Sequence, residues 1–209
     1  DSSSSRGLGD VYKRQTQRVQ TGEDMSKPRL VILHRNMGLL GGAQRDLIVA
    51  LPEHAKRWSI TVATLNAPKL LLDRCEQLGI EVITPDVPWQ LPTGPIAEVT
   101  ARAGRSALKT WRKLRVKLQP ALNAADACYI VLSTGGMEVL DIIPNNCPLY
   151  AYILERDKGI YDDVLQRDMD GRLRYPLIMK NLALTYLRRW DQRWHKRLWK
   201  RPRSVVSAN

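Results

Sequence analysis

Short apolar runs alternate with longer amphipathic segments along the chain from residue 29 onward. The apolar runs predict six strands, at 29–34, 59–65, 80–85, 128–133, 149–155 and 204–209. The amphipathic segments predict helices at 43–54, 68–79, 96–118 and 177–199, and Gly135–Gly136 is expected to open a further short helix. This alternation favours an α/β fold, a Rossmann-like parallel sheet of about six strands with helices on both faces.

Local signals set the expected ends of these helices. Gly79 follows the second helix as a C-cap. The third helix should end before Pro120, because proline has no N–H to donate. In the last helix every fourth residue is apolar or aromatic, and we expect this stripe to pack against the sheet. Its members are Ile178, Leu182, Tyr186, Trp190, Trp194 and Leu198.

Residues 1–24 differ from the rest of the chain. They are polar, contain a run of serines at 2–5 and have no periodicity, which predicts disorder. The string GLGDVYKRQ at 7–15 resembles translated sequencing-adapter read-through, so we expect a non-native leader and a natural start at Met25. A genuine disordered tail would have the same composition. The folded domain is therefore expected to span residues 25–209.

The chain is strongly basic, with a formal net charge of +12 from 33 basic and 21 acidic side chains. Residues 1–24 hold four of each sign, so the whole excess lies in 25–209. Such an excess suggests a polyanionic partner: nucleic acid, an anionic membrane or a phosphorylated substrate. Much of it falls on two predicted helices, and a membrane or anion surface is expected at Arg105, Lys109, Arg112 and Lys113. The alternative is that these charges are simply solvated while the apolar stripes form core.

Composition narrows the compartment and the cofactors. No run approaches the roughly 18–20 apolar residues that cross a bilayer, and no signal peptide is visible. We therefore expect a cytoplasmic protein that can sit peripherally on the inner face of the membrane. Cys75, Cys128 and Cys147 have no pairing or metal spacing, which indicates reduced thiols. The three histidines also lack ligand spacing, so we expect no metal.

A glycine-rich turn, NMGLLGG at 36–42, joins the first strand to the first helix. Gly41 and Gly42 would let a phosphate approach the backbone and the helix N-terminus, and Arg45 in the first turn could clamp it. A plain turn that needs positive φ would explain the same glycines. The turn is not G-x-G-x-x-G, and no acidic residue closes the second strand, so a dinucleotide fingerprint is not supported.

The segment MGLLGGAQRDLIVALPE (37–53) resembles the first loop and helix of family-4-type retaining glycosyltransferases, whose pattern is roughly G-x-G-G-A-E-R before an apolar helix. Further segments are similar to that family in the same order: ITVATL (60–65), LGIEVITPD (78–86), LYAYILERDKGIYDD (149–163), YLRRWDQR (186–193) and SVVSAN (204–209). The resemblance covers most of 29–209. Its departures are Gln44, where glutamate is common, and STGG at 133–136, where many members have a histidine.

The resemblance implies one half of a GT-B fold, the two-Rossmann architecture in which the N-terminal domain mainly holds the acceptor. Residues 25–209 would be this acceptor-side domain, truncated before a C-terminal donor-binding domain and inactive alone. The implied partners are a nucleotide sugar, a glycan or lipid-linked acceptor, and the missing domain. The nucleotide sugar is a substrate, and no cofactor is implied. Catalytic residues stay unknown, because the family's histidine has no counterpart here.

Ligands of open α/β sheets bind beyond the carboxyl ends of the strands. The residues expected to line the acceptor cleft there are His34, Thr134, Gly135, Gly136, Glu155, Arg156 and Tyr161. Glu155 and Arg156 could read sugar hydroxyls or a phosphate, although a surface ion pair would explain them too. The alternative function is a basic Rossmann-like nucleic-acid-binding module without catalysis. It is less favoured, because no RNA- or DNA-binding signature is present.

Overall fold

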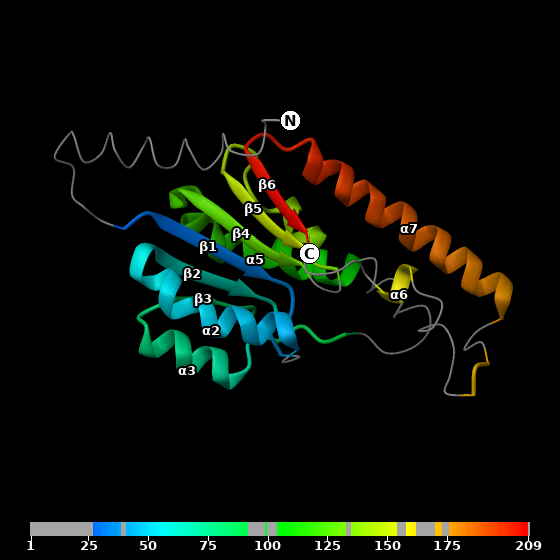
Figure 1. The fold of residues 1–209 in the computed structure, drawn as a ribbon, viewed down its shortest axis with the longest axis horizontal. Helices are drawn as coiled ribbons and strands as arrows, with labels where there is room; N and C mark the ends of the chain where they lie inside the picture. Colours follow the sequence, from blue (N-terminus) through cyan, green and yellow to red (C-terminus); the bar gives the residue numbers. More distant parts are fainter. Residues whose placement is uncertain are drawn as a thin grey trace.

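A computed structural model describes residues 27–38, 41–91, 99, 104–132, 135–153, 158–161, 170–172 and 176–208. The predicted leader at 1–24 lies outside these residues. Six strands form one sheet (Figure 1): β1 (Arg29–His34), β2 (Ser59–Thr64), β3 (Glu81–Ile83), β4 (Ala127–Leu132), β5 (Leu149–Ile153) and β6 (Ser204–Ala208). The helices are α2 (Gly42–Arg57), α3 (Lys69–Gln77), α5 (Arg105–Ala124), α6 (Lys158–Tyr161) and α7 (Leu177–Trp199), with a 3₁₀ helix, η1 (Met137–Asp141).

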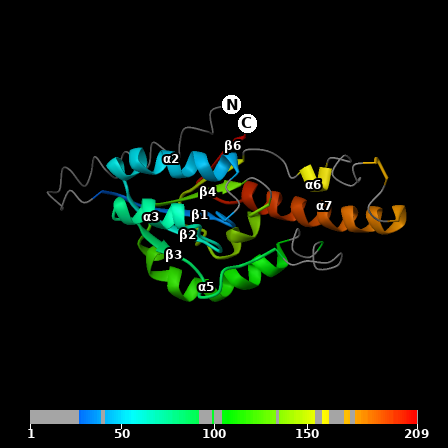
Figure 2. The ribbon, with the colours of Figure 1, turned by 90° about the horizontal axis from the view of Figure 1, so that it is seen from below.

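The strand order is β3-β2-β1-β4-β5-β6, and every neighbouring pair is parallel. This confirms the predicted α/β fold with a parallel sheet of six strands, in which β1 lies at the centre. The chain builds the sheet outward from β1 in one direction, then returns and builds from β4 in the other. Right-handed crossovers therefore place α2 and α3 on one face and α5 on the opposite face (Figure 2).

The central strand β1 supplies two separate cores, one on each face of the sheet. Val31 and Leu33 pack with Trp111 of α5 and with η1 and α7. Leu30 and Ile32 pack against α2 and α3. A strand buried on both faces reads as a continuous apolar run, which is why its position could be predicted.

The end of α3 confirms the predicted role of Gly79. This glycine follows the cap residue with φ at 64°, and its N–H donates to the carbonyl of Glu76 at 3.1 Å. The next N–H, of Ile80, donates to the carbonyl of Cys75 at 2.8 Å. These two bonds form a Schellman motif, in which a left-handed glycine satisfies the last carbonyls of a helix.

The predicted helix at 96–118 is interrupted at Gly104 and continues beyond its expected end. Gly104 is left-handed, with φ at 74°, so α5 begins at Arg105, and of residues 96–103 the structure describes only Val99, which is helical. At the other end α5 continues through Pro120 to Ala124. Proline removes the bond to the carbonyl of Val116, whose side chain is 81% exposed. That side of the helix faces water, which can hydrogen-bond the freed carbonyl.

The ends of α7 agree with the prediction, but its stripe packs only in part. Trp194 and Leu198 are buried, whereas Ile178 and Leu182 are 76% and 68% exposed. Successive residues of a helix are about 100° apart, so a four-residue spacing drifts by about 40° per step. Over the whole stripe the drift is about 200°, which places Ile178 and Leu198 on opposite sides. The first half of α7 also extends beyond the strands (Figure 1).

The two halves of this stripe should respond differently to truncation. We expect Trp194→Ala to lower the free energy of unfolding by about 3–5 kcal/mol, because it empties part of the core. Leu182→Ala removes an exposed side chain and should stay within about 0.5 kcal/mol. Urea denaturation of both variants measures the difference. Equal losses would show that the whole stripe is covered in solution.

Candidate functional site

The strand order reverses between β1 and β4, and the chain leaves these neighbouring strands in opposite directions. After β1 it passes over one face to α2, and after β4 it passes over the other face to η1. Such a reversal point opens a crevice at the carboxyl edge of a parallel sheet. The candidate site therefore consists of the described residues 35–38 and 41–42 after β1 and residues 135–138 after β4.

An ion pair links these two loops. The Arg35 guanidinium donates from Nε to Oε1 of Glu138 at 2.7 Å and from Nη2 to Oε2 at 2.6 Å. The Glu138 side chain is 2% exposed and that of Arg35 is 12% exposed. Arg35 also lies over the ring of Trp89, 6.0 Å from its centroid. A bidentate ion pair of this kind fixes the relative position of the two loops. Neither residue was among the predicted site residues.

Three glycines lie around this pair, and two of them, Gly104 and Gly135, make room for it. Gly104, Gly135 and Gly136 all have positive φ, at 74°, 77° and 105°. A Cβ on Gly135 would lie 2.7 Å from the guanidinium nitrogens of Arg35, and one on Gly104 would lie 2.8 Å from Oε2 of Glu138. Gly135 and Gly136 were predicted to line an acceptor cleft. Both have a structural reason to be glycine: Gly135 makes room for the Arg35 guanidinium, and Gly136 has a positive φ and would bring a Cβ within 3.2 Å of the Leu132 side chain.

Gly41 and Gly42 have no such cause in the described structure. Gly41 is the N-cap of α2 with φ at −76°, and Gly42 is not among the glycines with positive φ. A Cβ on Gly42 would meet nothing within 4 Å. No side chain caps α2 among the described residues, and its first turn holds no acidic residue. Arg45, which is exposed, lies in that turn.

His34, which was predicted to line the cleft, ends β1 with a buried side chain. Its Nδ1 accepts a hydrogen bond from the N–H of Asn36 at 3.2 Å. Burial lowers the pKa of His34 to about 4, and the charge of Arg35 adds to this effect. The neutral ring then carries its proton on Nε2, which has no partner among the described residues.

Of the remaining predicted cleft residues, the structure describes only Tyr161. Thr134, Glu155 and Arg156 lie outside the described residues. Tyr161 belongs to α6, and its hydroxyl donates to Oδ2 of Asp191 on α7 at 2.7 Å. This contact joins α6 to α7, so Tyr161 serves the packing of two helices.

The predicted basic surface on α5 divides into two pairs. Arg112 donates to Oδ2 of Asp141 at 2.8 Å, and Arg105 lies 5.2 Å from the ring centroid of Tyr186. Lys109 and Lys113 are exposed, and no ion pair involves them within the described part of the chain. Only these two lysines fit the original expectation of a free basic surface.

Two of the cysteines meet in space although their spacing predicted no pairing. The Sγ atoms of Cys128 and Cys147 lie 3.4 Å apart in the core, as free thiols. This hydrogen bond raises the pKa of Cys128 well above its ordinary value. Across the described residues, no group of three or more His, Cys, Asp or Glu side chains could hold a metal ion. No helix there has a stretch long and apolar enough to span a membrane.

The ion pair between the loops gives the first prediction for the site. Glu138→Ala leaves the largely buried guanidinium of Arg35 without its carboxylate, and we expect a loss of about 3–5 kcal/mol in unfolding free energy. Replacing both residues, as Arg35→Met with Glu138→Leu, should recover most of that loss. A double-mutant cycle in urea measures the coupling. Additive losses would mean that the two side chains do not act as a pair.

The buried histidine gives a prediction for pH. The unfolded chain binds a proton at His34 below about pH 6.5, whereas the folded chain does so only near pH 4. The unfolded state is therefore favoured as the pH falls through this window. We expect about 2–3 kcal/mol of stability to be lost between about pH 7 and pH 4.5 through this group. Urea denaturation of His34→Gln at both pH values should show a smaller loss, and an unchanged one would exclude His34 as its source.

No protein-family model matches this chain, and no curated protein matches it either. The assignment of a function therefore depends on the geometry at the reversal point and on the resemblance of residues 37–53.

Proposed function

We propose that this chain is the acceptor-side domain of a retaining, nucleotide-sugar-dependent glycosyltransferase. The sugar would pass from a nucleoside diphosphate to a saccharide or lipid-linked acceptor. The observation that carries the proposal is Gly42, at the uncapped start of α2 beside the reversal point.

Neither the fold nor the packing requires glycine at this position. A turn that needs positive φ would have explained the glycines, but neither Gly41 nor Gly42 has one. A Cβ on Gly42 would meet empty space, and alanine is a better helix former than glycine by up to about 1 kcal/mol. A ligand that must come close to the backbone gives glycine a reason to be there.

The start of α2 has the electrostatics that a diphosphate needs. The first N–H groups of a helix have no partner within the helix, and they lie at the positive end of its dipole. No described side chain caps them, and the first turn of α2 holds no acidic residue. Arg45 adds a positive charge in the same turn. This is the arrangement in which helix N-termini bind phosphate groups.

The loops after β1 and β4 would then form one wall of the transfer site. Arg35 and Glu138 hold these loops together, so that an incoming substrate meets a fixed surface. The Nε2 proton of His34 is a buried donor without a described partner at the end of β1, and it could be satisfied by a ligand oxygen. By the resemblance, the nucleotide itself lies mainly on a second domain. We propose that transfer requires that domain.

The expected peripheral contact with an anionic membrane is also a proposal. It now rests on Lys109 and Lys113, the exposed pair on α5. A lipid-linked acceptor would lie in the surface to which such lysines are attracted.

A graded series at Gly42 tests the proposal in a protein that includes the donor-binding domain. Gly42→Ala should lower turnover and Gly42→Val should lower it further, by about tenfold or more, because each added carbon stands where the diphosphate approaches. The melting temperature of the alanine variant should stay equal or rise, since the Cβ meets nothing. Release of nucleoside diphosphate from a panel of nucleotide sugars measures turnover.

Normal turnover by a folded valine variant would reduce the loop to a connection between β1 and α2. Turnover by residues 25–209 alone would contradict the need for a second domain. Salt-sensitive binding of random oligonucleotides, without any turnover, would favour the nucleic-acid-binding alternative.

A further inference from the structure

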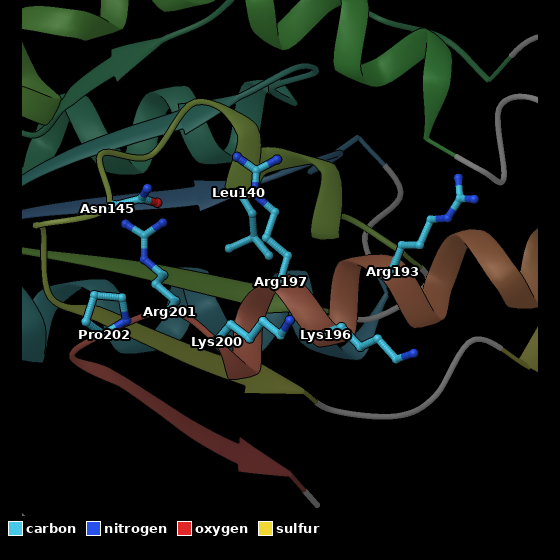
Figure 3. A pocket seen from close by; sticks show the side chains of 8 residues that line it. All are labelled: Leu140, Asn145, Arg193, Lys196, Arg197, Lys200, Arg201 and Pro202. Carbon is cyan, nitrogen blue, oxygen red and sulfur yellow. The ribbon is translucent and has the colours of Figure 1, made fainter.

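A cavity with a volume of about 390 Å³ lies at the last turns of α7. Its lining is dominated by basic side chains: Arg193, Lys196, Arg197, Lys200 and Arg201. Arg197 and Arg201 extend toward the segment that carries Leu140 and Asn145 (Figure 3). Arg201 leads into β6 and Asn145 precedes β5, so this end of the cavity lies near the amino ends of the strands. The Gly42 site lies at the carboxyl end of β1.

Arg201 is a buried positive charge in the wall of this cavity. Its guanidinium donates to the carbonyls of Ile143 at 3.2 Å, Cys147 at 3.5 Å and Pro144. Its Nε atom has no partner, and no carboxylate pairs with Arg201 among the described residues. Burial lowers the pKa of Arg201, and Arg197 nearby adds to this effect. Among the described residues, its charge is therefore offset by carbonyl dipoles and by the nearby thiols of Cys128 and Cys147, without a carboxylate.

Four more cations share one side of α7, at positions 193, 196, 197 and 200. Residues three and four apart on a helix are neighbours, and like charges at these spacings destabilise it by about 0.2–0.5 kcal/mol per pair. Arg197 has a carboxylate partner, Asp141 at 3.2 Å, but Asp141 also binds Arg112. The other three form no ion pair with any residue that the structure describes.

The helix dipole explains only part of this cluster. Cations are favoured near the C-terminus of a helix, but the effect fades within the last turn. Arg193 lies six residues before Trp199, the end of α7, and is outside that range. Arg201 lies beyond the helix and is buried. An anion in the cavity would relieve the repulsion along α7 and neutralise the buried guanidinium.

We propose that this cavity binds a phosphate group, carried either by a small phosphorylated molecule or by the headgroup of an anionic lipid. Guanidinium groups match phosphate oxygens in pairs, and Lys196 and Lys200 add point charges at the rim. The volume falls within the range of small-molecule sites, about 300–1,000 Å³. The inference does not depend on the proposed transferase function, because it uses none of the residues at the reversal point.

Inorganic pyrophosphate, titrated by calorimetry at constant ionic strength, is the first probe. The test variant is Lys196→Gln with Lys200→Gln, and the matched control is Arg57→Gln with Lys69→Gln. Both pairs are exposed and lower the net charge equally, but the control pair belongs to α2 and α3. Arg201 is left unchanged, because it holds the segment before β5 in place.

We expect saturable binding of pyrophosphate by the unmodified chain. The test variant should bind it more weakly by about tenfold or more, as losing charge-assisted hydrogen bonds implies, and the control should stay within about twofold. Equal weakening in both variants would show that only net charge matters and would overturn the proposal. So would the absence of saturable binding in the unmodified chain to both pyrophosphate and the vesicles below.

Vesicles distinguish the two sources of phosphate. The unmodified chain and both variants are sedimented with phosphatidylcholine vesicles, with and without phosphatidic acid. Binding that needs phosphatidic acid and is lost only in the test variant assigns the cavity to a lipid headgroup. Pyrophosphate binding without vesicle binding assigns it to a soluble phosphorylated molecule. Oligonucleotide binding that strengthens with oligonucleotide length and is equal in both variants would contradict the cavity as the binding site. It would indicate a diffuse nucleic-acid-binding surface.

Discussion

Because β1 lies between β2 and β4 in a parallel sheet, both of its faces have to be shielded from water. Every residue of β1 after Arg29 is buried. Parallel neighbours can be joined only by crossovers, and their fixed handedness sends them over opposite faces on the two sides of β1. The loops after β1 and β4 must therefore diverge at the carboxyl edge. This topological constraint places Arg35 and Glu138 at the same edge of the sheet, where they form their ion pair.

The elements whose signals are local were predictable from the sequence. Buried parallel strands are apolar runs, and all six strands lie within a few residues of their predicted places. The ends of α7 were predicted for the same reason, but the burial of its stripe was not. Whether Ile178 is covered depends on how far the sheet extends beneath α7, and no pattern within the helix records that. Likewise, Pro120 stays in α5 because that part of the helix faces water.

Only those features of the candidate site that depend on one strand and the turn after it could be predicted from the sequence. Gly42 could be predicted as a site residue because it lies at the end of the turn that follows β1 and opens a helix. The Arg35–Glu138 pair could not, since 103 residues separate its members. A weak signal existed in Glu138 itself, a carboxylate in the apolar string Met137–Leu140, where a charge implies a buried partner. The thiols of Cys128 in β4 and Cys147 just before β5 are in contact, but the spacing of these cysteines in the sequence does not predict that contact.

Asp141 connects the two basic helices and shows where the positive charge of the chain is left uncompensated. It accepts hydrogen bonds from Arg112 of α5 and Arg197 of α7, and the bond from Arg112 in particular lowers the pKa of this carboxyl. One carboxylate thus binds two cations, while Lys196 and Lys200, which line the same cavity as Arg197, form no ion pair in the described structure. Sequences that specify a fold tend to be consistent at every level, and functional sites are where that consistency breaks. Gly42, which the helix does not need, and the cations around the α7 cavity, which the helix does not favour, are two such breaks near opposite ends of the sheet. A bound phosphate group would give both of these features, the glycine and the cluster of cations, a function. Two such phosphate sites would account for the basic excess of this chain better than a uniformly charged surface would.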